Sequence, residues 1–536
     1  MAAIVAANIF AWVFVRAEQT VYFWDYAIYW MKFETVARGL HEYPLQEWLR
    51  LDSSIRHQEY NNVALWPLSP FAWFGGTSRL IYILSVVNVW MIPAALTFLG
   101  SRRDRPLDLF IIFTCPILWV AVLRGWFDVG GLIFANLVLA MAYQRRSSTP
   151  IPPKALLVMA VGLAMLPLFR RWYSFWGLSF WVVFVVDGLC DSAVSRDRKK
   201  ALFSIRQGLA LGAFTAILIT AFSWPMPLTV LKTDYRELLS SYRFNTSALG
   251  SLRQVLGYLG GCYSLMALGG FVGAVFDRSL RRFALFLVAQ TALILWLFFH
   301  VQDLGTQHYL LLLPPLIFFL IYWIRLVRHP VWTGAHLFLI IASFAWVFIP
   351  GAEKNLAFAR PLLPGVKCHP FYRDDIAEIR RLRDTLSRLN PHGQDRVYVL
   401  SSSPTLNSHT LNLSERSLGW PKQIEGTILW TRSVDKSEGF PADFFTARYV
   451  VVAQPVQYHM APKKQEVVGY LAEHLLKGDG PGLFYKRLPQ EFRLERGVRV
   501  FLFERTGKIG EQEISEIRAY FLSRYPEWGA FPINGV

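Results

Sequence analysis

Asp25 is the first residue whose surroundings suit chemistry, and it lies in the stretch FWDYAIYW. Its neighbours in the sequence are aromatic: Phe23, Trp24, Tyr26, Tyr29 and Trp30. Because aromatic rings limit the access of water to a carboxylate, they strengthen its affinity for a proton, which suits a general base. The competing interpretation is that Asp25 only caps a short helix at a membrane surface. A second acid, Asp128 in the stretch RGWFD, competes with Asp25 for the catalytic role.

Two adjacent cations, Arg170 and Arg171, follow an apolar segment that contains Pro167. A guanidinium keeps its charge and presents a rigid fork of donors, so such a pair is typical of a phosphate site. The same residues would also serve as anchors whose long side chains reach the headgroup layer. Two further candidate cations lie on a later polar loop: Arg243 and Arg253.

Polar residues also crowd between two apolar segments, in the stretch HVQDLGTQHY at residues 300–309. Such groups are unfavourable beside lipid unless they have a function. We expect hydrogen bonds to a sugar or a phosphate from Gln307, His308 and Tyr309. A metal held by His300 and His308 would need a third ligand, and the four cysteines show no metal-ligand spacing. We therefore expect no metal and no cofactor.

Long apolar segments must position all of these residues. The chain has 536 residues, of which 54% are hydrophobic and 17% charged, and apolar runs recur through its first two thirds. This pattern predicts a polytopic α-helical membrane protein. We expect about eleven transmembrane helices: Ala2–Val15, Leu80–Leu99, Leu107–Leu123, Val129–Tyr143, Ala155–Phe169, Tyr173–Leu189, Gly208–Phe222, Tyr263–Phe276, Phe283–Phe299, Tyr309–Ile324 and Ala335–Ile349.

Basic residues concentrate in alternate loops between these segments. They mark the loops at residues 102–105, 145–154, 196–206, 278–282 and 325–328, whereas the intervening short loops hold few. By the positive-inside rule, the basic loops are cytoplasmic. Loops 17–79 and 223–262, and the chain after residue 350, are then external. In the cytoplasmic (inner) membrane of a bacterium, that side is the periplasm. Much of the net charge of +17 thus reflects topology and does not indicate nucleic-acid binding.

The composition changes after Ile349, and in residues 360–536 charges are interspersed and no apolar run is long enough to span a bilayer. Three short apolar runs predict buried strands: Val397–Leu400, Tyr449–Val452 and Val498–Phe503. Helices are expected after Asp374, around Glu466–Leu476 and at Glu511–Ser523. This succession predicts a small soluble α/β domain. We therefore expect a transmembrane module at residues 1–352 and an external α/β domain at residues 353–536.

Several features, taken together, resemble the GT-C superfamily of integral-membrane glycosyltransferases. They are the aromatic first loop with Asp25, an external C-terminal domain, and three motifs: YNNVALWPLSPF (Tyr60–Phe71), FNTSALGSLR (Phe244–Arg253) and QHYLLLLPP (Gln307–Pro315). The resemblance covers residues 1–351 and implies a GT-C-like fold. It also implies transfer of a sugar from a polyprenyl-phosphate carrier on the outer face of the membrane, as in mannosyl- and arabinosyltransferases. Many members carry two acids in the first loop, whereas here Tyr26 follows Asp25.

The resemblance implies roles for the candidate residues. Asp25 is the general base for an acceptor hydroxyl, and the displacement inverts the anomeric centre. Arg170 and Arg171 stabilise the leaving phosphate. Their helpers come from the other polar loops: Arg243, Arg253 or His308. Four aromatic residues either stack on the sugar or the prenyl tail or anchor the loop at the membrane interface: Trp24, Tyr29, Trp30 and Trp66. The expected partners are a polyprenyl-phosphate sugar donor, a glycan, lipid or protein acceptor, and membrane lipids.

A multi-pass transporter, or a lipid or sugar flippase, is the alternative function. Such a protein also needs many spans and polar groups inside the membrane. Transporters usually show matching halves, and this sequence has no visible internal repeat. The glycosyltransferase is therefore the favoured interpretation.

Overall fold

The computed structural model describes residues 1–58, 60–99, 106–144, 151–245, 247–355, 357–526 and 528. Contacts divide the chain into a helical unit, formed by Met1–Arg16 and Tyr29–Pro370, and an α/β unit, formed by Ala17–Ile28 and Phe371–Val536. The sequence places the boundary between residues 352 and 353. In the structure, the chain after residue 352 packs with the helical unit as far as Pro370. The Trp346 indole N–H donates to the Pro364 carbonyl (2.8 Å), and the Cys368 amide donates to the Val347 carbonyl (2.8 Å).

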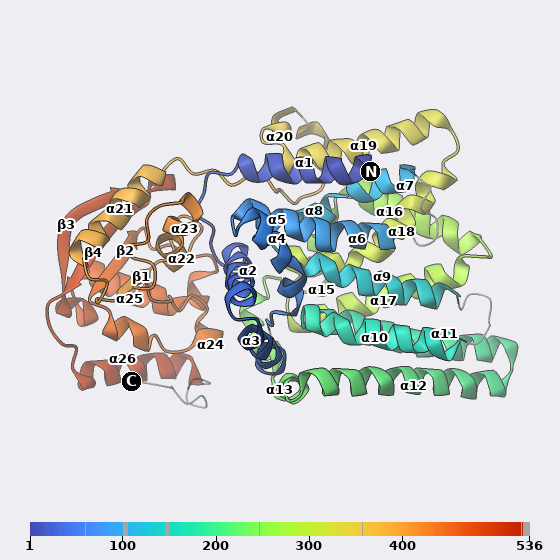
Figure 1. Ribbon diagram of the computed structural model, residues 1–536, viewed down its shortest axis with the longest axis horizontal. Coiled ribbons are helices and arrows are strands. Elements are labelled where there is room, and N and C mark those ends of the chain that lie inside the picture. Colours follow the sequence, from blue (N-terminus) through green and yellow to red (C-terminus); the bar gives the residue numbers. More distant parts are fainter. Residues whose placement is uncertain are drawn as a thin grey trace. The chain divides into compact units, whose positions relative to one another are not determined.

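The helical unit is built from helices and short helical turns (Figure 1). In chain order these are α1 (Ala2–Arg16), α2 (Asp25–Glu42, which begins in the α/β unit), α3 (Pro44–His57), η1 (Val63–Leu68), α4 (Ser69–Gly75), α5 (Arg79–Val86), η2 (Val87–Met91), α6 (Ile92–Thr97), α7 (Pro106–Phe113), α8 (Pro116–Leu123), η3 (Asp128–Gly130), α9 (Gly131–Gln144), α10 (Pro153–Phe169), α11 (Tyr173–Ser195), α12 (Arg198–Ser223), α13 (Met226–Lys232), α14 (Tyr235–Leu238), η5 (Ser240–Tyr242), α15 (Ala248–Leu259), α16 (Gly261–Phe276), α17 (Arg281–Val301), η6 (Thr306–Leu312), α18 (Leu313–Leu326), α19 (Pro330–Phe348), α20 (Ala352–Asn355) and η7 (Ala357–Ala359).

Each of the eleven predicted apolar segments is helical, as expected for backbone that has no water to bond with in lipid. Six described helices are long and apolar enough to cross a membrane: Arg79–Thr97, α11, α12, α17, Thr306–Leu326 and α19. The number rises to eight if two bent pairs are each one span, namely α7 with α8 (49°) and α15 with α16 (100°). The remaining predicted segments are the shorter apolar helices Ala2–Arg16, Asp128–Tyr143 and Pro153–Phe169.

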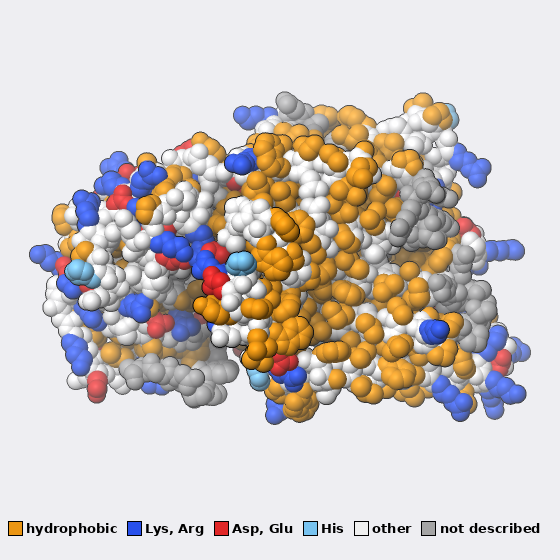
Figure 2. Space-filling model, in the orientation of Figure 1, with side chains coloured by type: hydrophobic (Ala, Val, Ile, Leu, Met, Phe, Trp, Pro, Cys, Tyr) orange, Lys and Arg blue, Asp and Glu red, His pale blue; other side chains and the backbone are white. Residues whose placement is uncertain are grey.

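Close packing holds these helices in roughly parallel rows (Figure 1). Helix α10 packs on α9, α11 and α12, and α16 packs on α18. Gly270 permits this last contact, because a Cβ there would lie 2.1 Å from the Phe319 carbonyl oxygen. Hydrophobic side chains cover the visible face of the helical unit, and Lys and Arg gather where α11 turns into α12 (Figure 2).

Ion pairs occur near two of the loops predicted to be cytoplasmic. Arg282 at the start of α17 binds Asp187 (2.9 Å) and Asp191 (3.3 Å) of α11. Arg325 of α18 binds Asp108 of α7. The predicted topogenic residues 102–105 and 145–150 lie outside the described residues.

The α/β unit has a four-stranded sheet in the order β1-β2-β4-β3, with β1 and β2 parallel and the other pairs antiparallel. Its strands are β1 (Val397–Leu400), β2 (Tyr449–Gln454), β3 (Tyr485–Arg493) and β4 (Arg499–Arg505). Its helices are α21 (Ile376–Leu389), α22 (Ser408–Asn412), α23 (Ser414–Leu418), α24 (Asp435–Glu438), α25 (Glu466–Lys477) and α26 (Glu511–Arg524), with short turns η8 (Ala442–Thr446), η9 (Pro462–Lys464), η10 (Gly480–Phe484) and η11 (Glu495–Gly497).

The sequence missed only β3 among these strands. It is an edge strand with the sequence YKRLPQEFR, and Tyr485 and Phe492 are its buried residues. A strand that is mostly exposed needs no apolar run, so hydrophobic patterning does not reveal it. The α/β unit thus has the predicted class of fold with one additional strand.

Candidate functional site

A buried ion pair between Asp128 and Arg170 lies at the centre of the candidate site. Asp128 begins η3, and Arg170 follows the last residue of α10. The Arg170 Nε donates to Asp128 Oδ1 at 2.5 Å, and the two side chains are 2% and 0% exposed. Tyr173 donates its hydroxyl to the Asp128 carbonyl at 2.9 Å. Both charges are therefore held in one orientation inside the helical unit.

A tight turn between α8 and η3 places Asp128. Gly125 in this turn has φ +93°, and a Cβ there would lie 2.4 Å from an Arg79 guanidinium nitrogen. Tyr82 donates to the Gly125 carbonyl at 2.7 Å. The RGWFD stretch is thus a rigid connection between two helices, which explains why Asp128 is buried immediately after an apolar span.

Aromatic rings surround the Arg170 guanidinium. Its Cζ lies 4.4 Å from the ring centroid of Tyr29, 4.7 Å from that of Tyr60 and 5.6 Å from that of Phe127. These distances are within the range of cation–π attraction. Tyr29, on α2, was predicted from the sequence to line the site, and the structure brings it to Arg170.

Arg171 and Lys32 add two more cations beside Arg170. The Arg171 Cζ lies 5.4 Å from the Tyr60 ring and 5.0 Å from the Tyr235 ring. Lys32 Nζ donates to the Tyr60 carbonyl at 2.6 Å. Burial lowers the pKa of Arg171, and burial together with the nearby Arg170 lowers that of Lys32.

The η6 turn brings His308 to the same region, because η6 packs on α8 and η3. The Trp172 ring lies edge-on to His308 at 5.3 Å. The Gly305 amide donates to His308 Nδ1 at 2.9 Å, so this nitrogen is an acceptor, and Gln307 Nε2 lies 3.5 Å from Nε2. Tyr309 stacks on Tyr258 at 3.5 Å.

Two buried donors in this region have no hydrogen-bond partner among the described residues. They are the Trp172 indole N–H and the Tyr309 hydroxyl. Buried polar groups are normally satisfied, so a bound molecule is one source of the missing acceptors.

Other predicted site residues lie apart from the buried pair or have other contacts. Trp30 is buried and donates its indole N–H to the Thr77 carbonyl at 2.7 Å. Arg243 is exposed and donates to the Phe299 carbonyl at 3.3 Å, and Arg253 is exposed on α15. Asp25 is the first residue of α2 and belongs by its contacts to the α/β unit.

Lys32 and Tyr60 are site residues that sequence reasoning missed. Lys32 had a weak signal: it lies seven residues after Asp25 in the same aromatic stretch. Tyr60 begins the motif YNNVALWPLSPF, but its side chain is 43% exposed, and nothing local shows that two arginines lie against its ring.

The arrangement gathers three cations, Lys32, Arg170 and Arg171, with the carboxylate of Asp128 among aromatic rings. An excess of fixed positive charge at a partly buried position favours an anion with several oxygens, such as a phosphate. No group of three or more His, Cys, Asp and Glu residues in the described part of the chain is arranged to hold a metal ion.

No protein-family model matches the chain, and no curated protein matches its sequence. Solved structures do match. ArnT from Cupriavidus metallidurans in the apo state aligns with a TM-score of 0.52 and 13% identity, over 95% of this chain and 98% of that chain. The same protein bound to undecaprenyl phosphate aligns with a TM-score of 0.52 and 12% identity, over 93% and 97% of the two chains.

Arabinofuranosyltransferase AftD from Mycobacteria gives a lower TM-score of 0.43 at 14% identity, over 95% of this chain and 42% of that chain. The ArnT alignments span both units, so the chain has the fold of ArnT. It is a multi-pass membrane protein with a C-terminal sheet domain.

Proposed function

We propose that this chain is a glycosyltransferase that moves a sugar from a polyprenyl-phosphate donor to a cell-envelope acceptor. The observation that carries the proposal is the Arg170–Asp128 pair inside an aromatic cage, beside Arg171 and Lys32. The structure of ArnT with undecaprenyl phosphate supports the class of donor. The acceptor is a glycan, a lipid or a protein on the outer face of the bacterial cytoplasmic membrane.

In the proposed reaction, Asp25 removes the proton from an acceptor hydroxyl. The oxygen of that hydroxyl forms a bond with the anomeric carbon of the donor sugar. The bond from this carbon to the phosphate oxygen breaks, and its electron pair leaves with the polyprenyl phosphate. A single displacement of this kind inverts the anomeric centre.

The cations stabilise the phosphate from which the sugar departs. Arg170 is fixed by Asp128, so its fork of donors is oriented before the reaction and needs little reorganisation. Arg171 and Lys32 lie at the less buried side of the cage and supply further charge. In this proposal Asp128 orients Arg170, while Asp25, one helical turn before Tyr29 on α2, is the base.

Binding of undecaprenyl phosphate to the purified protein tests the proposal. Arg171→Gln removes one charge-assisted contact, which contributes about 1.5–3 kcal/mol, so we expect affinity to fall by about tenfold to a hundredfold. Arg206→Gln, at an exposed position of α12, is the matched control and should bind as the unmodified protein does. Equal affinity of all three proteins would contradict the proposed phosphate site and identify Arg171 as a membrane anchor.

A further inference from the structure

The segment that leads into α2 belongs to the α/β unit. Gln19 forms a parallel bridge with Tyr372: its amide donates to Phe371 (2.9 Å), and its carbonyl accepts from the Arg373 amide (2.9 Å). The Phe371 ring then packs on Phe23 (6.0 Å between centroids) and Tyr26 (5.4 Å). Residues 17–28 are therefore integrated into the domain that follows them by more than 340 positions in the sequence.

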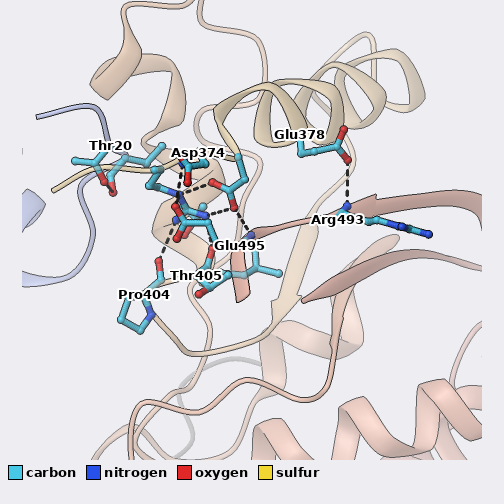
Figure 3. Close-up of polar contacts among 12 residues, drawn as sticks. Thr20, Asp374, Glu378, Pro404, Thr405, Arg493 and Glu495 are labelled. Atoms are coloured by element: carbon cyan, nitrogen blue, oxygen red, sulfur yellow. Dashed lines mark hydrogen bonds and ion pairs between the residues drawn. The ribbon is translucent and has the colours of Figure 1, made fainter. Parts of the chain in front are cut away.

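The segment that pairs with Gln19 is itself anchored by Arg373, beside Pro404 and Thr405, which are labelled in Figure 3. Its guanidinium makes two hydrogen bonds of 2.8 Å to Asp375 and also donates to the carbonyls of Pro404 (3.0 Å) and Thr405 (2.8 Å). The Asp375 carboxylate accepts from the Glu495 amide at 2.8 Å. A buried guanidinium satisfied in this way fixes the backbone on which Gln19 pairs.

The residue directly before Asp25 has an unusual backbone conformation. Trp24 has φ +45°, in the left-handed region that residues other than glycine rarely adopt. Its amide donates to His409 Nδ1 at 3.0 Å, and its ring lies 4.7 Å from that of His459. Trp24 thus turns the chain sharply, and α2 begins at the next residue. Such strain persists only where the surroundings hold it, and here the α/β unit does so.

We propose that the α/β unit positions Asp25 for proton transfer, with His409 as the residue that holds the turn at Trp24. This inference rests on the proposed role of Asp25 as the base. His409 is a positioning residue in this scheme, because it contacts the backbone before Asp25 and no substrate.

His409 is suited to this role because it presents an acceptor at a fixed place. It is buried on α22, and its ring lies 4.8 Å from that of Trp430 in an edge contact. His409→Phe keeps the ring and this contact but removes the acceptor. In His409→Asn the side-chain oxygen lies nearly where Nδ1 lies and restores the hydrogen-bond acceptor. The two variants therefore separate the hydrogen bond from packing.

Transfer kinetics of the full-length protein test the proposal. Since displacements of about 1 Å at a reacting group reduce rates by about a hundredfold, His409→Phe should lower kcat by about 10- to 100-fold, with KM for the donor unchanged. His409→Asn should recover most of the turnover. His474→Phe replaces a histidine that pairs with Asp479 (2.6 Å) and should transfer normally.

Hydrogen exchange at residues 17–28 gives a readout that needs no activity. We expect faster exchange there in His409→Phe, near-normal exchange in His409→Asn, and unchanged exchange in β2 of both variants. Normal kcat or normal exchange in a folded His409→Phe protein would overturn the proposal.

Failure of the proposed function has a different signature. If Asp25→Asn transfers sugar normally, the base is misassigned and the inference falls with it. If Asp25→Asn is inactive while His409→Phe is fully active, only the inference fails. If the unmodified protein transfers no sugar, the glycosyltransferase proposal fails, and the exchange measurement still decides whether His409 holds the turn.

Discussion

At the level of single residues, three carboxylates compete for the role of base. Asp128 forms an ion pair with Arg170, with 2.5 Å between Oδ1 and Nε. Asp303 accepts hydrogen bonds from the Ser251 hydroxyl (2.5 Å) and from the amides of Phe244 (2.7 Å) and Asn245 (2.8 Å). Although burial raises the pKa of Asp303, these donors together hold it below its usual value. Both residues are therefore poor proton acceptors.

Replacing each carboxylate by its amide tests this assignment. Asp25→Asn keeps nearly the same volume but accepts no proton, so we expect turnover to fall by about a hundredfold or more with donor binding retained. Asp128→Asn should instead weaken donor binding and stability together, because a buried Arg170 loses its counter-ion. Rates of sugar transfer and affinities for undecaprenyl phosphate, measured on the same preparations, check both. An active Asp25→Asn with an inactive Asp303→Asn would assign the base to Asp303, between α17 and η6.

At the level of elements, the site is formed by the ends of helices and by short turns. Arg170 follows α10, Asp128 begins η3, and His308 lies in η6. Long helices supply the rigid frame, while the breaks between them supply the polar side chains. In the α/β unit, the short helix α22 likewise supplies a polar side chain, His409, which contacts the turn before α2.

The stability of the α/β unit should depend on pH through His409. Burial lowers its pKa to about 4, below the unfolded value of 6.5. Between these values the unfolded chain binds more protons than the folded one. The contribution of His409 to the free energy of unfolding is therefore complete above pH 6.5. It is lost as the pH falls towards 4, by up to about 3 kcal/mol.

Comparison with His409→Asn separates the pH dependence caused by His409 from that caused by Asp435. Burial raises the Asp435 pKa to about 7, so its contribution has the opposite sign: it is complete below about pH 4 and is lost as the pH rises to 7. His409→Asn removes the histidine and leaves Asp435 unchanged. Relative to His409→Asn, the unmodified protein should lose unfolding free energy from pH 7 to pH 4, and exchange of the β2 amides at each pH measures this loss. A constant difference would exclude His409 as the titrating group.

At the level of the whole molecule, the distribution of basic residues predicts the orientation in the membrane. The α11–α12 loop, at residues 196–200, carries Arg196, Arg198, Lys199 and Lys200. We expect a reporter fused after Lys200 to be cytoplasmic and one fused after Lys367 to be external. Each reporter is an enzyme that is active on only one side of the membrane, so its activity measures the side on which the fusion point lies. Two reporters on the same side would mean that one of the predicted spans between Lys200 and Lys367, such as the bent pair α15 and α16, does not cross.

The sequence by itself determined the class of fold and the individual elements. Apolar runs such as Tyr173–Leu189 become helices in any packing, because the backbone in lipid must satisfy its own hydrogen bonds. The strand at Val397–Leu400 and the amphipathic α21 are equally visible, since burial of one run or one face leaves a local pattern. The sequence also pointed to Arg170 and Asp128, whose charges are costly to place near lipid without a use, and to the aromatic residue Tyr29.

Only the tertiary structure decided how these residues combine. Nothing local shows that Asp128 and Arg170 form a buried pair, that Tyr60 covers two guanidinium groups, or that Lys32 joins them. The strand β3 leaves no apolar run because it lies at an edge, and residues 17–28 join the α/β unit through distant contacts such as the bridge from Gln19 to Tyr372. Contacts across such separations depend on how whole helices and sheets pack, and that packing leaves no periodic trace in the chain.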